Sequence, residues 1–310
     1  MSSDTLGSKL VGVIAFPVTP FRADLSLDLD GLRRNLRSLM AHPIAGVVAA
    51  GGTGELYSLA PDEYDQVIRA TIEEVAGRVP VIAGVGFNTA IAVRLARNAA
   101  SAGASGLLAF PPYYPGADDD GVLEYYRAIG DASSLAMLIY SRDWFHPGPD
   151  LVERLARIPS LIAWKDGQGD IRRLQQLQAR VGNRLRWIGG AGDDMVPAYY
   201  AIGIRAFTSS VANIAPDVAL RLHAAGSSGD ISTLHDLITD LIVPLYALRA
   251  RRRGYEVTVM KELMNLVGLD GGVVRPPLPH LRSSELEELR ALAPRWQALL
   301  QTATAANSGS

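Results

Sequence analysis

The stretch Leu161-Ile-Ala-Trp-Lys165-Asp-Gly167 is a short apolar run that ends in two charged residues and a glycine. A continuous apolar run of this length is typical of a strand that is buried on both faces of a parallel sheet. Amphipathic segments with helical spacing lie on either side of it, at residues 149–156 and 170–181. A buried strand between two helices predicts one unit of an alternating α/β fold.

The same unit recurs along the chain. Eight apolar runs are predicted as strands, at residues 11–15, 46–50, 81–85, 106–110, 136–140, 161–165, 185–189 and 205–209. Segments with the apolar spacing of amphipathic helices lie between most of these runs, at residues 62–76, 89–102, 121–132, 149–156, 170–181 and 193–202. Eight parallel strands that alternate with helices predict a closed (β/α)8 TIM barrel, with a doubly wound sheet as the alternative.

The strand pattern ends at residue 216. Helices are predicted beyond it, at residues 217–225, 231–253, 255–267 and 283–300. We therefore expect residues 1–216 to form a catalytic barrel and residues 217–310 a C-terminal helical segment packed on it. The basic run Arg249-Ala-Arg-Arg-Arg253 is interpreted as a solvated helix end.

Composition excludes several classes of function. The 310 residues carry 30 basic and 32 acidic side chains, and this balance offers no clustered positive surface for a nucleic acid. The absence of cysteine excludes disulfides, thiolate metal sites and cysteine nucleophiles. The five histidines lack ligand spacing, so no catalytic metal is predicted. No uninterrupted apolar run reaches the roughly 18–20 residues of a membrane span, and the short polar N-terminus is unlike a signal peptide. We expect a cytoplasmic protein.

Lysine is scarce in this chain, which has only Lys9, Lys165 and Lys261. Arginine serves wherever a cation suffices, whereas a lysine can lose its proton and attack a carbonyl. Lys165 stands at the end of a predicted barrel strand, where TIM-barrel active sites are built. An apolar floor beneath it would lower its pKa and make it a nucleophile that forms an imine. An ion pair with Asp166 is the alternative.

Tyr140 closes the predicted strand before that of Lys165. Because neighbouring strands lie about 4.8 Å apart, the phenol and the amine can meet, and a phenol can relay protons to an imine intermediate. The alternative is a tyrosine that only fills the barrel. Arg142, two residues later, can clamp a carboxylate or lie on the surface.

Two glycine-rich loops follow other strands. Gly51-Gly52-Thr53-Gly54-Glu55 offers free backbone N–H groups and a hydroxyl to a carboxylate or phosphate. It lacks the spacing of a P-loop or a dinucleotide site. The loop 189–194 is either a phosphate site or a tight turn.

Together these motifs resemble the dihydrodipicolinate synthase/N-acetylneuraminate lyase family, over residues 11–280. The resemblance lies in Gly-Gly-Thr-Gly-Glu, in the tyrosine that closes the fifth strand and in Trp-Lys-Asp at the end of the sixth. It implies that Lys165 is the Schiff-base lysine and Tyr140 the proton relay. Gly52 and Thr53 would hold the carboxylate of a 2-keto acid, with the carbonyl of Thr208 facing it. A homo-oligomer, dimer or tetramer, is also implied, with no cofactor.

Within this family the chain is most similar to 5-dehydro-4-deoxyglucarate dehydratases. The similarity lies in residues 51–64, 165–171 and 274–278. Synthases and lyases usually carry a hydroxyl residue where Gly52 stands, and Arg142 fits the dehydratase pattern. Tyr113-Tyr114, Gly192-Asp-Asp and residues 209–213 look more like the synthases.

The resemblance implies a lyase that converts 5-dehydro-4-deoxy-D-glucarate into 2,5-dioxopentanoate, water and carbon dioxide through an imine on Lys165. The alternatives are cleavage of a 2-keto-3-deoxy sugar acid to pyruvate and a condensation like that of dihydrodipicolinate synthase. A phosphosugar barrel and a non-catalytic sugar-acid sensor also remain possible, and neither needs the lysine as a nucleophile.

Overall fold

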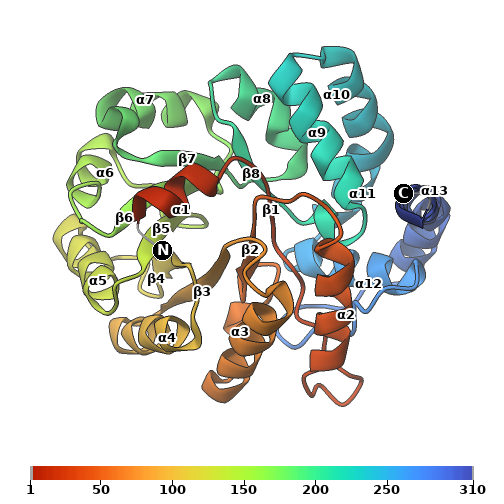
Figure 1. Ribbon diagram of the computed structural model, residues 1–310, viewed down its shortest axis with the longest axis horizontal. Coiled ribbons are helices and arrows are strands. Elements are labelled where there is room, and N and C mark those ends of the chain that lie inside the picture. Colours follow the sequence, from red (N-terminus) through yellow and green to blue (C-terminus); the bar gives the residue numbers. More distant parts are fainter. Residues whose placement is uncertain (1–2, 309–310) are drawn as a thin grey trace.

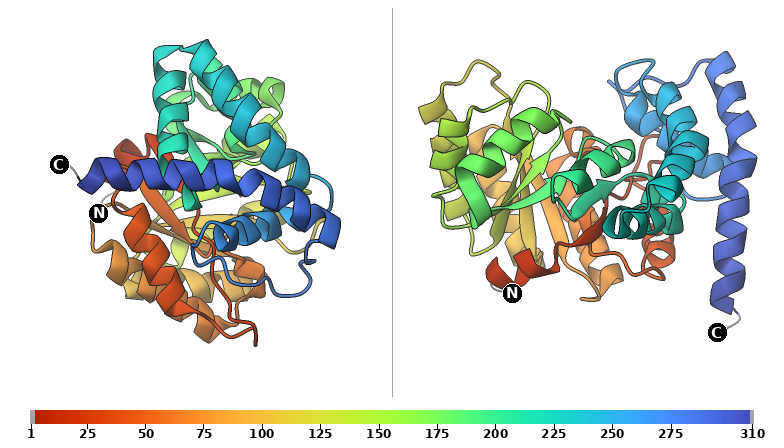
Figure 2. Two further views of the ribbon diagram at one scale, coloured as in Figure 1. Left: turned by 90° about the vertical axis from the view of Figure 1, so that its right-hand side faces the viewer. Right: turned by 90° about the horizontal axis from the view of Figure 1, so that it is seen from above.

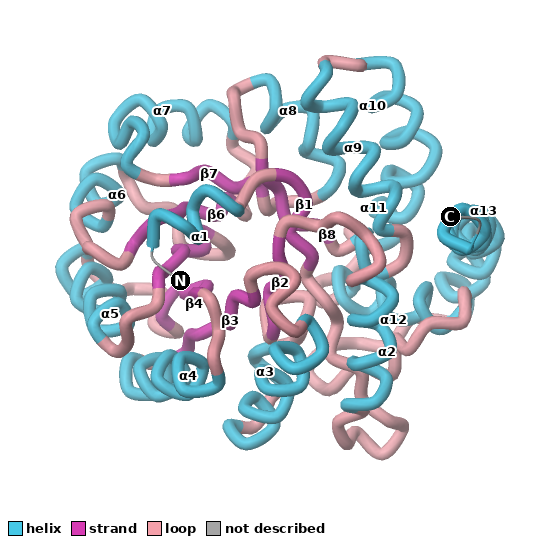
Figure 3. The backbone as a smooth tube through the Cα atoms, in the orientation of Figure 1, coloured by secondary structure: helices cyan, strands magenta, loops and turns pink. Residues whose placement is uncertain are grey.

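The computed structural model describes residues 3–308 and shows a closed barrel of eight parallel strands with helices around it (Figures 1 and 3). This confirms the predicted fold. The strands are β1 Gly12–Ala15, β2 Gly46–Ala49, β3 Val81–Phe87, β4 Gly106–Pro112, β5 Ala136–Ser141, β6 Leu161–Asp166, β7 Arg186–Gly189 and β8 Ala206–Ser209. Each strand pairs with its neighbour in sequence, and β8 pairs with β1 to close the ring.

The outer helices follow the strands in turn. They are α2 Leu29–Leu39, α3 Pro61–Val75, α4 Thr89–Ala102, α5 Asp119–Asp131, α6 Pro149–Leu155, α7 Ile171–Val181, α8 Val196–Ala201 and α9 Pro216–Ser228. Several begin where a polar side chain accepts a hydrogen bond from a free backbone N–H, as Asn88 does from Ile91. Gly103 ends α4 in the left-handed conformation that glycine adopts at no steric cost.

The helix α1, Ser3–Lys9, lies at the N-terminal mouth of the barrel (Figure 3). Its Leu6 is buried, and a Cβ on Gly106, the first residue of β4, would lie 2.7 Å from the Leu6 side chain. The N-terminal mouth is therefore filled with packed side chains, as the core of a TIM barrel is.

The C-terminal helices gather on one side of the barrel (Figure 2). They are α10 Ile231–Leu237, the π-helical turn Ile238–Ile242, α11 Val243–Arg249, α12 Tyr255–Leu266 and α13 Ser283–Ser308. The helix α9, which starts at the predicted boundary, packs against β1 and α8 and takes the place of the eighth barrel helix. The division at residue 216 stays a prediction.

The continuous helical run Ile231–Arg249 is long and apolar enough to satisfy a length-and-composition criterion for a membrane span. Asp236 and Asp240 interrupt its apolar sequence. Its buried side chains include Leu234, Leu245 and Leu248, and the run packs against α9 and α12. Those contacts place one face of it in the core of the protein.

Candidate active site

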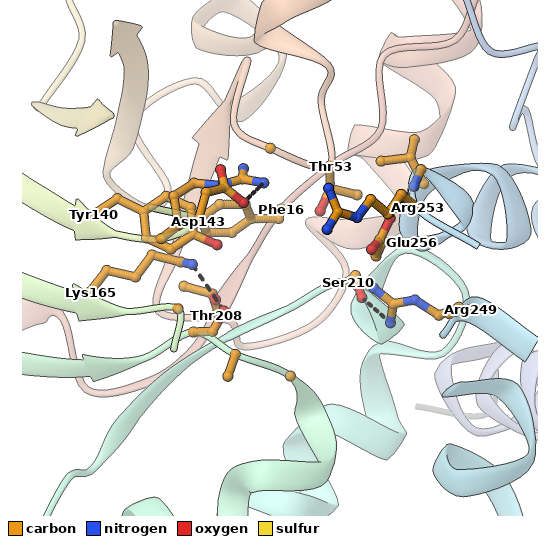
Figure 4. A pocket seen from close by; sticks show the side chains of 18 of the residues that line it. Phe16, Thr53, Tyr140, Asp143, Lys165, Thr208, Ser210, Arg249, Arg253 and Glu256 are labelled. Carbon is orange, nitrogen blue, oxygen red and sulfur yellow. Dashed lines mark hydrogen bonds and ion pairs between the residues drawn. The ribbon is translucent and has the colours of Figure 1, made fainter. Parts of the chain in front are cut away.

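A cavity of about 810 Å³ opens at the C-terminal ends of the strands and reaches the C-terminal helices (Figure 4). The six residues that the sequence singled out all line it, and they are Gly52, Thr53, Tyr140, Arg142, Lys165 and Thr208. They come from four different strand ends, because a barrel brings the carboxyl ends of all its strands to one face. The volume lies in the range usual for small-molecule sites.

The amine of Lys165 is held inside this cavity. The residue is only 2% exposed, and its Nζ donates a hydrogen bond of 3.1 Å to the carbonyl of Gly190. Burial lowers the pKa of Lys165 well below its usual value, and the nearby Arg142 guanidinium lowers it further. Asp166, the alternative ion-pair partner, has the opposite but smaller effect on this pKa. Its carboxylate accepts a 2.8 Å hydrogen bond from the hydroxyl of Tyr199. Burial and Arg142 therefore favour the neutral form of the amine, which is the form that attacks a carbonyl.

Tyr140 and Lys165 lie directly opposite each other on β5 and β6. The Nζ of Lys165 stands 3.2 Å from the centre of the Tyr140 ring, so the amine lies over the face of the ring. Burial raises the pKa of Tyr140, whereas Arg142 lowers it. The phenol therefore keeps its proton at neutral pH and has a cation beside it that would stabilise the phenolate.

Gly190 was not singled out for this role by the sequence, where its loop was interpreted as a phosphate site or a tight turn. A Cβ on Gly190 would lie 2.7 Å from Cε of Lys165 and 2.7 Å from the carbonyl oxygen of Asp166. Only glycine lets this backbone approach the lysine so closely. The loop after β7 therefore makes room for the amine and accepts its hydrogen bond.

Arg142 and Gly52 also fit one another. Nη1 of Arg142 lies 2.8 Å from the position of a Cβ on Gly52, closer than a real side chain would tolerate. The guanidinium centre lies 5.3 Å from the ring centre of Tyr140, and Nε forms a 2.7 Å ion pair with Asp143. The missing side chain at position 52 thus leaves the space that the arginine occupies, beside the lysine and the glycine-rich loop.

A buried ion pair supports that loop from behind. Glu55, at its end, is fully buried and pairs with Lys261 of α12, which is 1% exposed. Nζ of Lys261 also donates to the carbonyl of Val273 at 2.8 Å. Desolvation raises the pKa of Glu55 and lowers that of Lys261, and each partner opposes the shift of the other. The sequence did not reveal this pair, since its partners lie at opposite ends of the chain.

Two residues of the basic run 249–253, which is largely exposed, also form the wall of the cavity away from the lysine. Arg249 and Arg253, taken from sequence as part of a solvated helix end, both line the cavity. The guanidinium of Arg249 stacks 4.1 Å from the ring centre of Tyr246, and its Nη1 donates to Ser210 Oγ at 3.1 Å. Only the fold of the C-terminal helices brings them there.

Asp193, which also lines the cavity, is fully buried. Its carboxylate accepts hydrogen bonds from the hydroxyls of Tyr246, at 2.6 Å, and of Ser209. Burial raises the pKa of Asp193. Within residues 3–308, no group of three or more His, Asp or Glu side chains is placed to hold a metal ion.

Residues 9–295 match the model of the dihydrodipicolinate synthetase family. A probable 5-dehydro-4-deoxyglucarate dehydratase of Bradyrhizobium diazoefficiens is 40% identical over 307 residues, which cover 98% of this chain and 97% of the relative. A second protein of that description, from Streptomyces avermitilis, is 41% identical and covers 97% of this chain and 99% of its own.

Solved structures of dihydrodipicolinate synthases have the same fold as this chain. Dihydrodipicolinate synthase from Oceanobacillus iheyensis superposes with a TM-score of 0.90 at 30% identity and covers 96% of this chain and all of its own. The synthase from Acinetobacter baumannii, complexed with pyruvate, gives 0.85 at 28% identity and covers 94% of this chain and 99% of its own. With a closed barrel, a buried lysine at its sixth strand and matches over nearly its whole length, the chain belongs to the dihydrodipicolinate synthetase family.

Proposed function

We propose that this chain is a Schiff-base-forming lyase that converts 5-dehydro-4-deoxy-D-glucarate into 2,5-dioxopentanoate, water and carbon dioxide. The observation that carries the proposal is the buried amine of Lys165, whose pKa is lowered and which lies over the ring of Tyr140. The cavity around this amine is large enough for a six-carbon diacid. Relatives described as probable dehydratases, at about 40% identity over nearly the whole chain, support this choice of substrate.

The reaction begins when the amine of Lys165 attacks the ketone at carbon 5. The protonated phenol of Tyr140 donates its proton to the departing hydroxyl, so that water leaves and a protonated imine remains. The phenolate that results, stabilised by Arg142, is then the base that removes a proton from carbon 4. The electrons left on carbon 4 expel the hydroxyl of carbon 3, which takes the proton that Tyr140 has just gained and leaves as a second water.

The conjugated iminium is the electron sink for the next bond cleavage. The bond from carbon 2 to the distal carboxylate breaks, its electron pair enters the conjugated system, and carbon dioxide leaves. Protonation and addition of one water release the aldehyde product and restore the amine. We propose that no cofactor takes part, since the imine supplies the electron sink.

The carboxylate next to the ketone has a place near the lysine. We propose that Gly52 and Thr53 bind it through backbone N–H groups and the threonine hydroxyl, with the guanidinium of Arg142 beside them. We also propose that the carbonyl of Thr208, a residue of β8 that lines the cavity, faces the same position. Arginine pairs with carboxylates in a planar, two-bond geometry, so this corner of the cavity suits the 2-keto acid end.

Borohydride reduction in the presence of the substrate tests the proposal. We expect a stable adduct that peptide mass mapping places on Lys165, and we expect the Lys165→Ala variant to form none. An adduct on another residue, or no adduct with the wild-type protein, would refute the mechanism.

The other reaction that the family supports is condensation or aldol cleavage, as the likeness to solved dihydrodipicolinate synthases suggests. The same lysine would serve it, so product analysis is needed. Carbon dioxide and 2,5-dioxopentanoate support the dehydratase, whereas pyruvate released from a 2-keto-3-deoxy sugar acid supports the aldolase. A cytoplasmic location and a homotetramer also stay predictions, and light scattering of the purified protein tests the tetramer.

A further inference from the structure

Two arginines lie across the cavity from the reactive amine. Arg249 is the last residue of α11, and Arg253 lies in the turn before α12. In Figure 4 their side chains, with that of Ser210, stand on the opposite side of the cavity from Lys165 and Tyr140. None of the steps from imine formation to release of the second water uses them.

Arg249 is held in place before any ligand arrives. Its stacking on Tyr246 and its bond to Ser210 fix the guanidinium, and Tyr246 is itself anchored by Asp193. Its Nε is buried and has no hydrogen-bond partner among the described residues. A buried donor without a partner is rare. Because this atom has no exposed surface, a ligand would instead meet the outer N–H groups of the guanidinium, at the cavity wall that Arg249 lines.

We infer that Arg249 and Arg253 bind the distal carboxylate of the substrate, the one that departs as carbon dioxide. This inference rests on the proposed function. The six-carbon diacid carries a carboxylate at each end, and the cavity has arginine on both sides, with Arg142 near the lysine and this pair opposite. The planar guanidinium, with its fork of donors, matches a carboxylate better than any other side chain.

The pair would select diacids and orient the bond that breaks. The electron sink for decarboxylation remains the iminium on Lys165, so the arginines position the leaving group rather than take up its electrons. Glu256 lies on the same wall and would repel a second carboxylate, but its one negative charge is outnumbered by the two guanidinium groups of Arg249 and Arg253.

The test compares two substrates in three proteins. The substrates are the diacid and the monoacid in which a primary alcohol replaces the distal carboxylate. The proteins are the wild type, Arg253→Gln and the matched control Arg251→Gln, whose arginine pairs with Glu288 at 2.6 Å on the surface. The readout is the concentration of each acid that gives half-maximal borohydride-trapped adduct on Lys165.

We expect Arg253→Gln to weaken the diacid about 10–100-fold, the usual range for one charge-assisted hydrogen bond, and to leave the monoacid unchanged. Arg251→Gln should leave both unchanged. Arg249→Lys, which keeps the charge but loses the planar fork, should weaken the diacid in the same selective way. The inference would be overturned if Arg253→Gln bound the diacid as tightly as the wild type, or if it lost the same affinity for the diacid and for the monoacid. A wild-type protein that traps neither acid would instead refute the proposed function itself.

Discussion

The buried pair of Glu55 and Lys261 makes the sharpest stability prediction. Replacing Lys261 with Met preserves the length and apolar stem of the side chain but leaves the fully buried Glu55 carboxylate without its ion-pair partner. Removing one partner of a buried pair costs about 3–5 kcal/mol, because the other charge stays desolvated. The hydrogen bond from Lys261 to the carbonyl of Val273 is also lost. A loss of this size is a large part of the 5–15 kcal/mol by which most domains are stable.

The control is the double variant Glu55→Gln/Lys261→Met, in which no charge is left buried. We expect it to recover most of the loss, since replacing both partners of a buried pair is often nearly neutral. Urea unfolding followed by tryptophan fluorescence measures both variants. Trp164 in β6 and Trp296 in α13 are each 1% exposed, so the signal reports the barrel and the C-terminal helices together.

The dependence on pH distinguishes this cause from a simple packing defect. Burial raises the pKa of Glu55, and without Lys261 nothing comparable opposes that rise. A carboxyl whose pKa is higher in the folded state binds more protons there, so folding gains stability as the pH falls through that pKa. The single variant should therefore regain stability relative to the double variant as the pH falls from neutral toward the ordinary pKa of a glutamate. A loss below about 1 kcal/mol, or one that does not change with pH, would refute the assignment of the pair.

Three further results are expected at the site. Tyr140→Phe should still form the trapped adduct but turn over about 10²–10⁴-fold more slowly, which steady-state kinetics measures, because it removes the proton relay and keeps the ring. Gly52→Ser should weaken the binding of every 2-keto acid, because the new Cβ would lie 2.8 Å from Nη1 of Arg142. The trapping assay measures this as a higher concentration of acid at half-maximal adduct. Unchanged binding would contradict the fit of Gly52 and Arg142. Arg142→Gln should move the acid limb of pyruvate trapping to higher pH, because the guanidinium lowers the pKa of Lys165. A limb that stays in place would show that burial alone sets that pKa, and a limb that moves to lower pH would contradict the effect assigned to Arg142.

Local patterns in the chain predicted the barrel and the residues proposed to react in it. The eight apolar runs and the helices between them are recognised from patterns that extend over a few residues, and strands that follow one another in an α/β chain are usually neighbours in the sheet. Tyr140 and Lys165 could be placed side by side because each closes one of two consecutive strands, and the observed register pairs them. The loops that follow the strands could likewise be assigned to the active-site face.

Contacts between distant segments could not be predicted in this way. Lys261 finds Glu55, and Arg249 and Arg253 reach the cavity, only because the C-terminal helices fold back over the strand ends. No periodicity links such residues, since their distance depends on how whole elements pack. The sequence by itself therefore determined the barrel and the lysine at its sixth strand. Only the tertiary structure decided how deeply that lysine is buried and which side chains lie across the cavity from it. Both depend on packing between segments that are far apart in the chain.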